Sequence, residues 1–115
     1  MELFETDQII TTSDGICLDL SKITSSEELN LAYHLAKKSF SQNKNIAKNF
    51  NYEFLLWLSG KKDISFALSE YGAKEGKKII FVVFANFEKW KNLKKIKLEK
   101  STSFEVLERI SLSRI

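Results

Sequence analysis

Side chains suited to catalysis or metal binding are scarce in this sequence. His34 is the only histidine and Cys17 is the only cysteine, whereas the common metal sites need several such ligands at close, regular spacing. A Cys–His pair would have to be assembled from these two distant residues. The segment from Gly72 to Gly76 lacks the Gly-x-x-x-x-Gly-Lys spacing of a phosphate-binding loop. We therefore expect no catalytic residue, no metal and no cofactor, and we expect His34 to lie at the surface.

Glu53 is an acidic residue in a strongly apolar segment. It lies between Phe50 and the run Phe54–Leu56, where an ionised carboxylate is costly unless it is hydrogen-bonded or paired. A buried acid with no partner base is more often structural than catalytic. We interpret Glu53 as bonded internally, either to a lysine or to backbone NH groups. The alternative is an enzyme subunit with a shared active site, which would show a ligand pocket around Glu53 or His34.

Charge is unevenly distributed along the chain, although the formal net charge is only +3. Residues 1–36 hold one lysine against seven acidic residues, a net charge of −6. Residues 37–100 hold fifteen lysines against six acidic residues, a net charge of +9. Clustered lysines favour a polyanionic partner such as nucleic acid, because phosphate neutralisation releases counterions. The alternative is that the lysines only keep a small protein soluble.

Turn signals and apolar periodicity predict the first elements. Ile9–Thr12 and Ile16–Leu20 are rich in β-forming residues and are separated by a Ser-Asp-Gly turn signal, so that either they form a hairpin or one of them is a strand. A helix follows, through about Ser41. Ser25 is placed to cap it, and Glu28 stands three residues later, as in a capping box.

Two further helices and a buried strand are predicted next. Apolar residues from Ile46 to Leu58 recur at helical spacing and indicate a mostly buried helix, which Gly60 would end in a left-handed conformation. Asp63 would cap a third helix, and Gly72 would close it. The remaining expected elements are a central strand at Lys78–Phe84, a short helix from Asn86 to Leu93, an edge strand around Ile96 and Leu98, and a last helix capped by Ser101, Thr102 or Ser103 that runs nearly to Ile115.

These elements predict an α+β protein. We expect one small domain over residues 1–115, with a central mixed β-sheet and helices packed around it. No apolar run approaches the roughly 20 residues of a membrane-spanning helix, and the acidic start lacks the features of a signal peptide. A single cysteine fits a reducing compartment. The sequence therefore favours a cytoplasmic protein with no membrane partner.

One region of the chain carries a set of spaced residues that is more particular than packing requires. They are Lys44, Ile46, Ala47, Glu53, Leu55, Ser59, Gly60, Ile64, Ala67, Gly72, Ala73, Lys74 and Gly76. In this order and spacing they resemble the small kinase-binding subunit of the KEOPS complex, the family that includes the PRPK-binding protein, in an archaeal-type member. Asn45 stands where that family often has a proline, and Phe54 where it usually has a smaller aliphatic residue.

The resemblance implies a subunit that is not an enzyme. Members of the family bind the KEOPS kinase/ATPase subunit and, through it, the threonylcarbamoyl-transferring subunit. They are also credited with recruiting tRNA by its 3′ CCA end, for threonylcarbamoyladenosine modification next to the anticodon. The alternative is a stand-alone small RNA-binding module, which would bind nucleic acid without a kinase partner.

The resemblance implies that the tRNA-binding residues of this sequence lie in two segments, residues 44–48 and residues 72–74. A helix beginning at Ile46 would offer free NH groups and a positive dipole end to phosphates, with further lysines and small residues allowing close approach. The alternative is that Gly72 only caps a helix and Gly76 only forms a turn. The expected tRNA-binding residues are Lys44, Ile46, Ala47, Lys48, Gly72, Ala73 and Lys74.

The last predicted helix is the expected kinase interface. At about 100° per residue its apolar side chains span an arc of roughly 240°, which is wider than the stripe of about 100° that a core-facing helix needs. We expect Phe104, Leu107 and Ile115 to face the protein's own core. The expected kinase-contacting residues are Val106, Ile110 and Leu112, with the first helix as a neighbouring element. The alternative is that all of these side chains pack inward.

Overall fold

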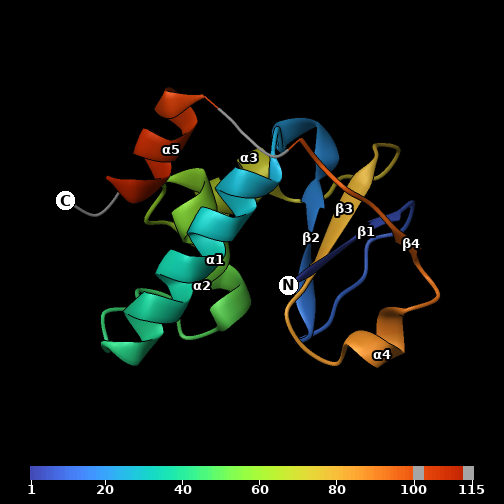
Figure 1. Cartoon of the computed structure of the whole chain (residues 1–115), viewed down its shortest axis with the longest axis horizontal. Helices are drawn as coiled ribbons and strands as arrows, with labels where there is room; N and C mark the ends of the chain where they lie inside the picture. Colours follow the sequence, from blue (N-terminus) through green and yellow to red (C-terminus); the bar gives the residue numbers. More distant parts are fainter. Residues whose placement is uncertain (100–102, 113–115) are drawn as a thin grey trace. The chain divides into compact units, whose positions relative to one another are not determined.

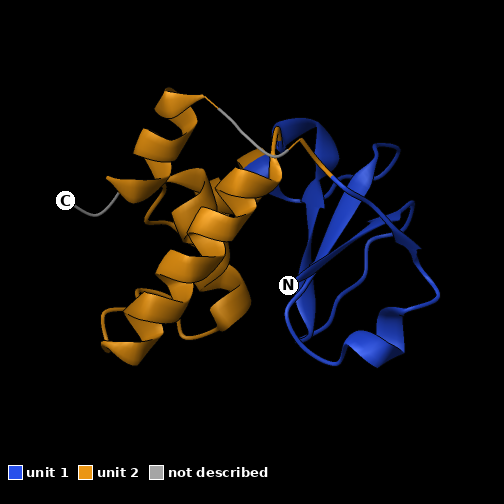
Figure 2. Ribbon diagram, viewed as in Figure 1, with its two compact units in different colours: residues 1–23, 71–97 blue, residues 24–70, 98–115 orange. Residues whose placement is uncertain are grey.

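The computed structural model describes residues 1–99 and 103–112 (Figure 1). In chain order its elements are β1 (Glu2–Thr6), β2 (Gly15–Asp19), the 3-10 helix η1 (Leu20–Lys22), α1 (Ser26–Ser41), α2 (Phe50–Ser59), α3 (Ile64–Tyr71), β3 (Ile79–Val83), α4 (Phe87–Trp90), β4 (Lys94–Lys95) and α5 (Phe104–Ser111). The predicted α+β class is confirmed. The chain divides into two compact units (Figure 2): unit 1 comprises residues 1–23 and 71–97, and unit 2 comprises residues 24–70 and 98–115.

Unit 1 is built on a four-stranded sheet in the order β2-β3-β1-β4. Every ladder in this sheet is antiparallel, so the expectation of a mixed sheet is wrong. All five residues of the central strand β3 are buried, as its apolar sequence predicts. A continuous apolar run indicates burial on both faces, which an antiparallel strand can also have, and it does not determine strand direction.

Strand β1 is absent from the elements expected from the sequence. It pairs with β3, with Phe4 opposite Phe81. Phe4 alone of its five residues is buried. Leu3 and Phe4 are adjacent and are flanked by Glu2 and Glu5, so the segment lacks the alternating apolar pattern that predicts a half-buried strand. Of the two candidate strands that follow, β2 is a strand and Ile9–Thr12 is not. The edge strand β4 occupies Lys94–Lys95, just before the predicted position at Ile96.

A buried carboxylate joins the two loops at one end of the sheet in unit 1. Asp14 is only 5% exposed, and its carboxylate accepts hydrogen bonds from Asn86 Nδ2 at 2.8 Å and Trp90 Nε1 at 3.0 Å. The Asp14 carbonyl oxygen accepts from the Phe84 NH at 2.8 Å. The bond from Asn86 is the main reason that the pKa of Asp14 lies below its usual value. This carboxylate fastens the segment after β3 to the loop before β2.

Unit 2 contains the longer helices, and their ends follow local capping chemistry. Ser25 Oγ accepts from the Glu28 NH at 3.3 Å and starts α1, as predicted. Helix α2 begins at Phe50 rather than at the predicted Ile46. The reason is Asn49, whose side-chain oxygen accepts from the second and third NH groups of α2 and so fixes the start of the helix there.

The ends of the remaining helices are also set locally. Gly60 follows α2 with φ 73, the left-handed conformation predicted for it, whereas positive φ occurs at Gly76 and not at Gly72. Asp63 Oδ1 caps α3 by accepting from the NH of its third residue at 3.2 Å. Ser103 caps α5; the other two candidate caps and Ile115 lie outside the described residues.

Candidate functional site

Glu53 is the most completely buried acidic group in unit 2, with 0% of its surface exposed. Its Oε1 accepts from the backbone NH groups of Ile46 and Ala47, each at 3.0 Å. Its Oε2 accepts from Ser39 Oγ at 2.7 Å and from Trp57 Nε1 at 3.2 Å. The interpretation of Glu53 as internally bonded to backbone NH groups is confirmed.

These bonds change the expected phosphate site. The sequence predicted a helix N-terminus at Ile46 with NH groups free to bind phosphate. The NH groups of Ile46 and Ala47 are instead held by Glu53, and the helix starts at Phe50. That part of the expectation is wrong, because a buried carboxylate of the same chain already occupies the donors.

Beside this carboxylate, unit 2 contains a pocket of about 480 Å³. This volume lies in the range of pockets that hold small molecules and cofactors, roughly 300–1,000 Å³. Its walls come from the end of α1, the segment that follows it, α2 and the turn after α2. The lining residues are Leu35, Lys38, Ser39, Gln42, Lys44, Ile46, Trp57 and Lys62.

The pocket combines an apolar surface with positive charge. Ile46 is 48% exposed, and Trp57 retains an exposed fraction of 9%. Three lysines, one from each of α1, the following segment and the turn after α2, stand around this surface, and no acidic residue in the described part of the chain lines it. Amines beside an aromatic or aliphatic surface are the combination that binds single-stranded nucleic acid, where bases stack and phosphates are neutralised. The pocket therefore offers both an apolar surface and positive charge to a ligand.

Glu53 stands behind the pocket and does not line it. Three of its partners, Ser39, Ile46 and Trp57, do line the pocket. A carboxylate with no exposed surface and its oxygens engaged by four donors is not placed to contact a substrate. His34 is exposed on α1, as expected, and is not among the lining residues.

The residues expected to bind tRNA fall into two groups. Lys44 and Ile46 lie in the wall of the unit 2 pocket. Ala47 is buried, and Lys48 is exposed but does not line the pocket. The other three expected residues belong to unit 1, where Gly72 forms a bridge with Leu18 and Lys74 Nζ donates to the Gly72 carbonyl oxygen at 3.4 Å. The residues of the pocket that sequence reasoning missed are Leu35, Lys38, Ser39, Gln42, Trp57 and Lys62.

Helix α5 presents a different face from the one expected. Ile110 is fully buried, so its expected place in a partner interface is wrong. Phe104 was expected to face inward but is 74% exposed, while Leu112 is 48% exposed. Val106 and Leu107 are half-buried. A helical wheel gives the apolar faces of a helix but not which of them turns inward.

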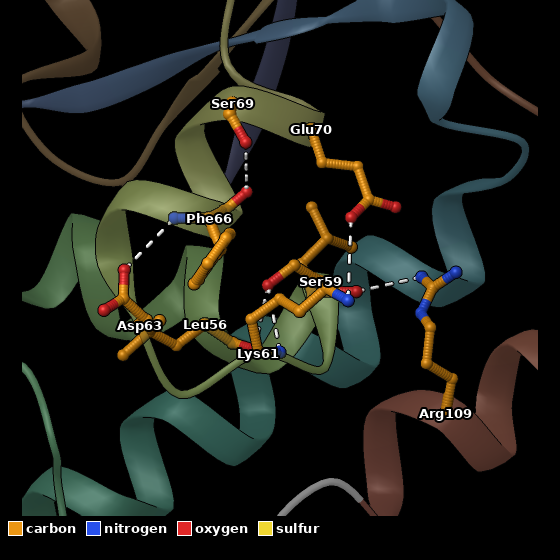
Figure 3. Close-up of polar contacts among 9 residues, drawn as sticks. Leu56, Ser59, Lys61, Asp63, Phe66, Ser69, Glu70 and Arg109 are labelled. Atoms are coloured by element: carbon orange, nitrogen blue, oxygen red, sulfur yellow. Dashed lines mark hydrogen bonds and ion pairs between the residues drawn. The ribbon is translucent and has the colours of Figure 1, made fainter.

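Arg109 explains how α5 is oriented within unit 2 (Figure 3). Its Nη2 donates to the Leu58 carbonyl oxygen at the end of α2, at 2.9 Å. The stem of Arg109 also lies against Gly60, where an added Cβ would be 3.0 Å from Arg109 Cγ. The guanidinium therefore bonds to the C-terminal turn of α2, next to the residue that ends that helix, and the neighbouring Ile110 is buried.

Residues 5–114 match the protein family described as "Kinase binding protein CGI-121". The chain belongs to this family. It is also similar to the KEOPS complex subunit Cgi121 of Pyrococcus abyssi (strain GE5 / Orsay), with 40% identity over 69 residues. The matched stretch covers 57% of this chain and 40% of that relative, so the similarity spans less than half of the relative's length.

Membership in this kinase-binding family confirms the family expected from the spaced residues at positions 44–76. The family match extends from β1 through the whole of α5, and it therefore includes the pocket and the helix expected to contact the kinase. Among the described residues, no cluster of three or more His, Cys, Asp or Glu side chains is placed to hold a metal ion. Within the same residues, no helix has both the length and the apolar character needed to cross a membrane.

Proposed function

We propose that this protein is a non-catalytic subunit of the KEOPS complex that binds the kinase/ATPase subunit and recruits tRNA. Kinase binding is supported by membership in the family of kinase-binding proteins, and KEOPS membership by the similarity to the KEOPS complex subunit Cgi121 of Pyrococcus abyssi. Through the kinase subunit, the protein would be linked to the threonylcarbamoyl-transferring subunit. In this proposal the chain contributes binding surfaces, and the chemistry belongs to its partners.

The unit 2 pocket is the proposed site for the 3′ CCA end of tRNA. The observation that carries this proposal is the combination, in one pocket, of an exposed Ile46 and the Trp57 indole with three lysines and no acid. A volume of about 480 Å³ lies in the range of small-molecule sites, roughly 300–1,000 Å³, and is too small for a duplex. An unpaired 3′ end is the part of a tRNA whose bases are free to enter such a pocket.

The tRNA proposal is tested by charge reversal inside and outside the pocket. The double variant Lys44→Glu/Lys62→Glu changes two lining lysines, and Lys22→Glu/Lys97→Glu changes the same number of exposed lysines that neither line the pocket nor belong to the expected tRNA-binding residues. We expect the pocket variant to lose at least about tenfold in tRNA affinity, because each lost phosphate contact weakens binding and lowers its salt dependence. The control variant should stay within about threefold of the wild type.

A tRNA that lacks its 3′ CCA provides the decisive comparison. We expect this shortened tRNA to bind the wild-type protein much more weakly than the intact tRNA. Equal binding of the two would exclude the pocket as the site of the 3′ end. Strong tRNA binding with no binding to a KEOPS kinase subunit would instead favour the stand-alone RNA-binding module.

For the kinase, we propose that the exposed part of α5 is the contact, with Leu112 and Phe104 as its apolar side chains and Val106 at its margin. Ile110 is removed from the expected interface because it is buried in the protein itself. The double variant Phe104→Glu/Leu112→Glu should stay folded and fail to co-elute with the kinase subunit. Phe66→Glu is a matched control, because Phe66 is also an exposed aromatic residue, at 68% exposure, on another helix of unit 2. Full co-elution of the α5 variant would place the interface elsewhere.

A further inference from the structure

The buried carboxylate of Glu53 touches three sides of the unit 2 pocket at once. Ser39 belongs to α1, Ile46 to the segment that follows it, and Trp57 to α2. All three line the pocket, and all three donate to Glu53 within 2.7–3.2 Å. We infer that Glu53 is a positioning residue for nucleic-acid binding, which presets the pocket for an unpaired nucleotide without touching it. This inference rests on the proposed function, because it assigns Glu53 a role in that same site.

The segment between α1 and α2 shows why such a residue is needed. Residues 42–49 contain no helix or strand, yet they carry Lys44 and Ile46 into the pocket wall. The Lys44 NH bonds to the Ser39 carbonyl oxygen at 2.8 Å, and the next two anchors are the NH groups of Ile46 and Ala47 on Glu53 Oε1. The NH groups of Gln42 and Asn43 also bond back to α1, at the Lys38 and Phe40 carbonyl oxygens. Without the carboxylate, the segment would keep these anchors next to α1 and lose the two at Ile46 and Ala47. The position of the Ile46 side chain therefore depends on Glu53.

The other oxygen of Glu53 sets the orientation of the indole. Trp57 Nε1 donates to Glu53 Oε2 at 3.2 Å and lies 3.5 Å from Ser39 Oγ. These contacts hold the edge of the ring toward the interior of unit 2. A ring whose rotation is already fixed loses little conformational freedom when a base packs against it, so binding is stronger than it would be for a mobile side chain.

A side chain with two acceptor oxygens matches this set of partners. The NH groups of Ile46 and Ala47 and Nε1 of Trp57 can only donate, and the Ser39 hydroxyl is shared between Glu53 Oε2 and the Ala36 carbonyl oxygen, which lies 2.9 Å away. Glutamine has nearly the same shape but replaces one oxygen with an NH₂ group. If its oxygen keeps the two backbone NH groups, its NH₂ group faces the Trp57 NH, and two donors meet. Glu53→Gln therefore preserves the volume of the side chain while disturbing the wall of the pocket.

The experiment measures affinity and its salt dependence for the full chain. The probe is a fluorescently labelled single-stranded RNA that ends in CCA, and binding is followed between about 50 and 200 mM salt. For folded Glu53→Gln we expect Kd to rise at least about tenfold. The salt slope should fall by no more than the single contact of Lys44, about 0.7 for a single strand, because Lys38 and Lys62 have no hydrogen bond to Glu53 within the described part of the chain. Lys38→Glu/Lys62→Glu should instead lower the slope by about two contacts.

A merely structural role would lower the unfolding temperature of Glu53→Gln and leave Kd unchanged at temperatures where the variant is folded. That result overturns the inference. If Glu53→Gln does not fold, Ser39→Ala decides, because it removes one bond to the carboxylate and keeps Glu53. An approximately threefold or greater rise in Kd for folded Ser39→Ala supports the inference, and an unchanged Kd overturns it. Failure of the wild-type protein to bind the probe is a separate result, which rejects the proposed tRNA site and this role of Glu53 with it.

Discussion

Each unit of this protein contains a buried carboxylate bonded to an indole, and the two carboxylates have different structural roles. In unit 1, Asp14 accepts from Trp90 and from Asn86, which come from the short helix after β3 and from the residue before it. In unit 2, Glu53 accepts from Trp57 and from three other donors. Asp14 ties loops to the end of a sheet, whereas the partners of Glu53 are walls of a pocket.

The difference follows from how sheets and helices satisfy their backbones. The strands of unit 1 pair with one another along β3, so their backbone groups are satisfied within the sheet, and side chains such as Asp14 hold the loops at its ends. Each helix of unit 2 leaves four NH groups and four carbonyl groups without partners at its ends. Asn49, Glu53 and Arg109 satisfy some of these groups or those of the adjoining segment. Polar side chains therefore determine more of the architecture in unit 2, and the candidate site lies there.

The largest expected effect comes from placing a charge in the core of unit 2. Phe54 on α2 is 0% exposed, and Phe54→Asp should lower the free energy of unfolding by several kcal/mol, about 4 or more, because it buries an unpaired carboxylate and removes an aromatic side chain. Chemical denaturation followed by circular dichroism measures this change. An unchanged denaturation midpoint would contradict the core assignment.

The same variant tests whether the two units unfold together. We expect a single domain over residues 1–115. Phe54→Asp should therefore also increase the unfolding of unit 1 and the hydrogen exchange of its backbone amides. Amide hydrogen exchange of Ile80 and Val82 in β3 reports on unit 1. If these amides stay protected while α2 exchanges freely, the units are independently stable, and the comparison between them becomes one between two domains.

A smaller effect is expected from the guanidinium that bonds to the end of α2. Arg109→Met keeps an apolar stem beside Gly60 but removes the donor to the Leu58 carbonyl oxygen. The free energy of unfolding should fall by about 1–3 kcal/mol. Arg109→Lys, which keeps the charge but loses the fork of donors, should fall between the wild type and Arg109→Met. Equal stability of all three proteins would show that polar bonds to helix ends do not hold unit 2 together.

Local signals in the sequence predicted helix ends well, because a cap depends on a few neighbouring residues. Ser25 and Gly60 were placed correctly on that basis. The start of α2 was misplaced by four residues, since apolar spacing continues through Ile46 while Asn49 competes for the NH groups. Strand β1 was missed because only Phe4 in it is buried, and strand direction was missed because burial does not encode it.

The candidate site was only partly predictable, for a related reason. The position of Glu53 among apolar residues was enough to predict that its carboxylate is hydrogen-bonded inside the protein. The identity of its partners requires knowing that α1 and α2 pack against each other, which brings Ser39 to Glu53 and Lys38 to the pocket. The outward face of α5 depends in the same way on the bond between Arg109 and α2. Contacts between elements were not visible in the spacing of residues within each one.

The comparison between the two carboxylates can be sharpened by pH. The pKa of Asp14 is held below its usual value, first by the hydrogen bond from Asn86. A depressed pKa in the folded state means that Asp14 contributes stability above its unfolded pKa of about 4, and that this contribution is lost as pH falls through the folded pKa. Asp14→Asn should therefore be less stable than the wild type at pH 7, and the difference should shrink below about pH 4.

Thermal unfolding at several pH values measures this difference, and RNA binding provides the contrast with Glu53. At pH 7, folded Asp14→Asn should bind the CCA-ended probe like the wild type, because Asp14 and its partners do not line the unit 2 pocket. A loss of binding as large as that of Glu53→Gln would remove the distinction between a carboxylate that fastens loops and one that positions a site.

The smallest expected effects come from two glycines that take left-handed conformations, one in each unit. Gly60 has φ 73 and Gly76 has φ 78. Apart from its two neighbours in the chain, an added methyl group at Gly76 meets no atom of the described residues within 4 Å, whereas at Gly60 it lies 3.0 Å from Arg109 Cγ. Gly76→Ala should lower the free energy of unfolding by about 1 kcal/mol, the cost of a left-handed alanine, and Gly60→Ala by about 1–2 kcal/mol, since the Arg109 stem must also shift. In an Arg109→Ala background, the excess at Gly60 should become smaller, because Cγ is removed and only the Arg109 carbonyl oxygen, 3.3 Å from the added Cβ, remains close. Denaturant midpoints of the wild type, the two single variants and the double variant at positions 60 and 109 measure this coupling. If Gly60→Ala costs the same free energy of unfolding in both backgrounds, the Arg109 side chain does not restrict the residue that ends α2.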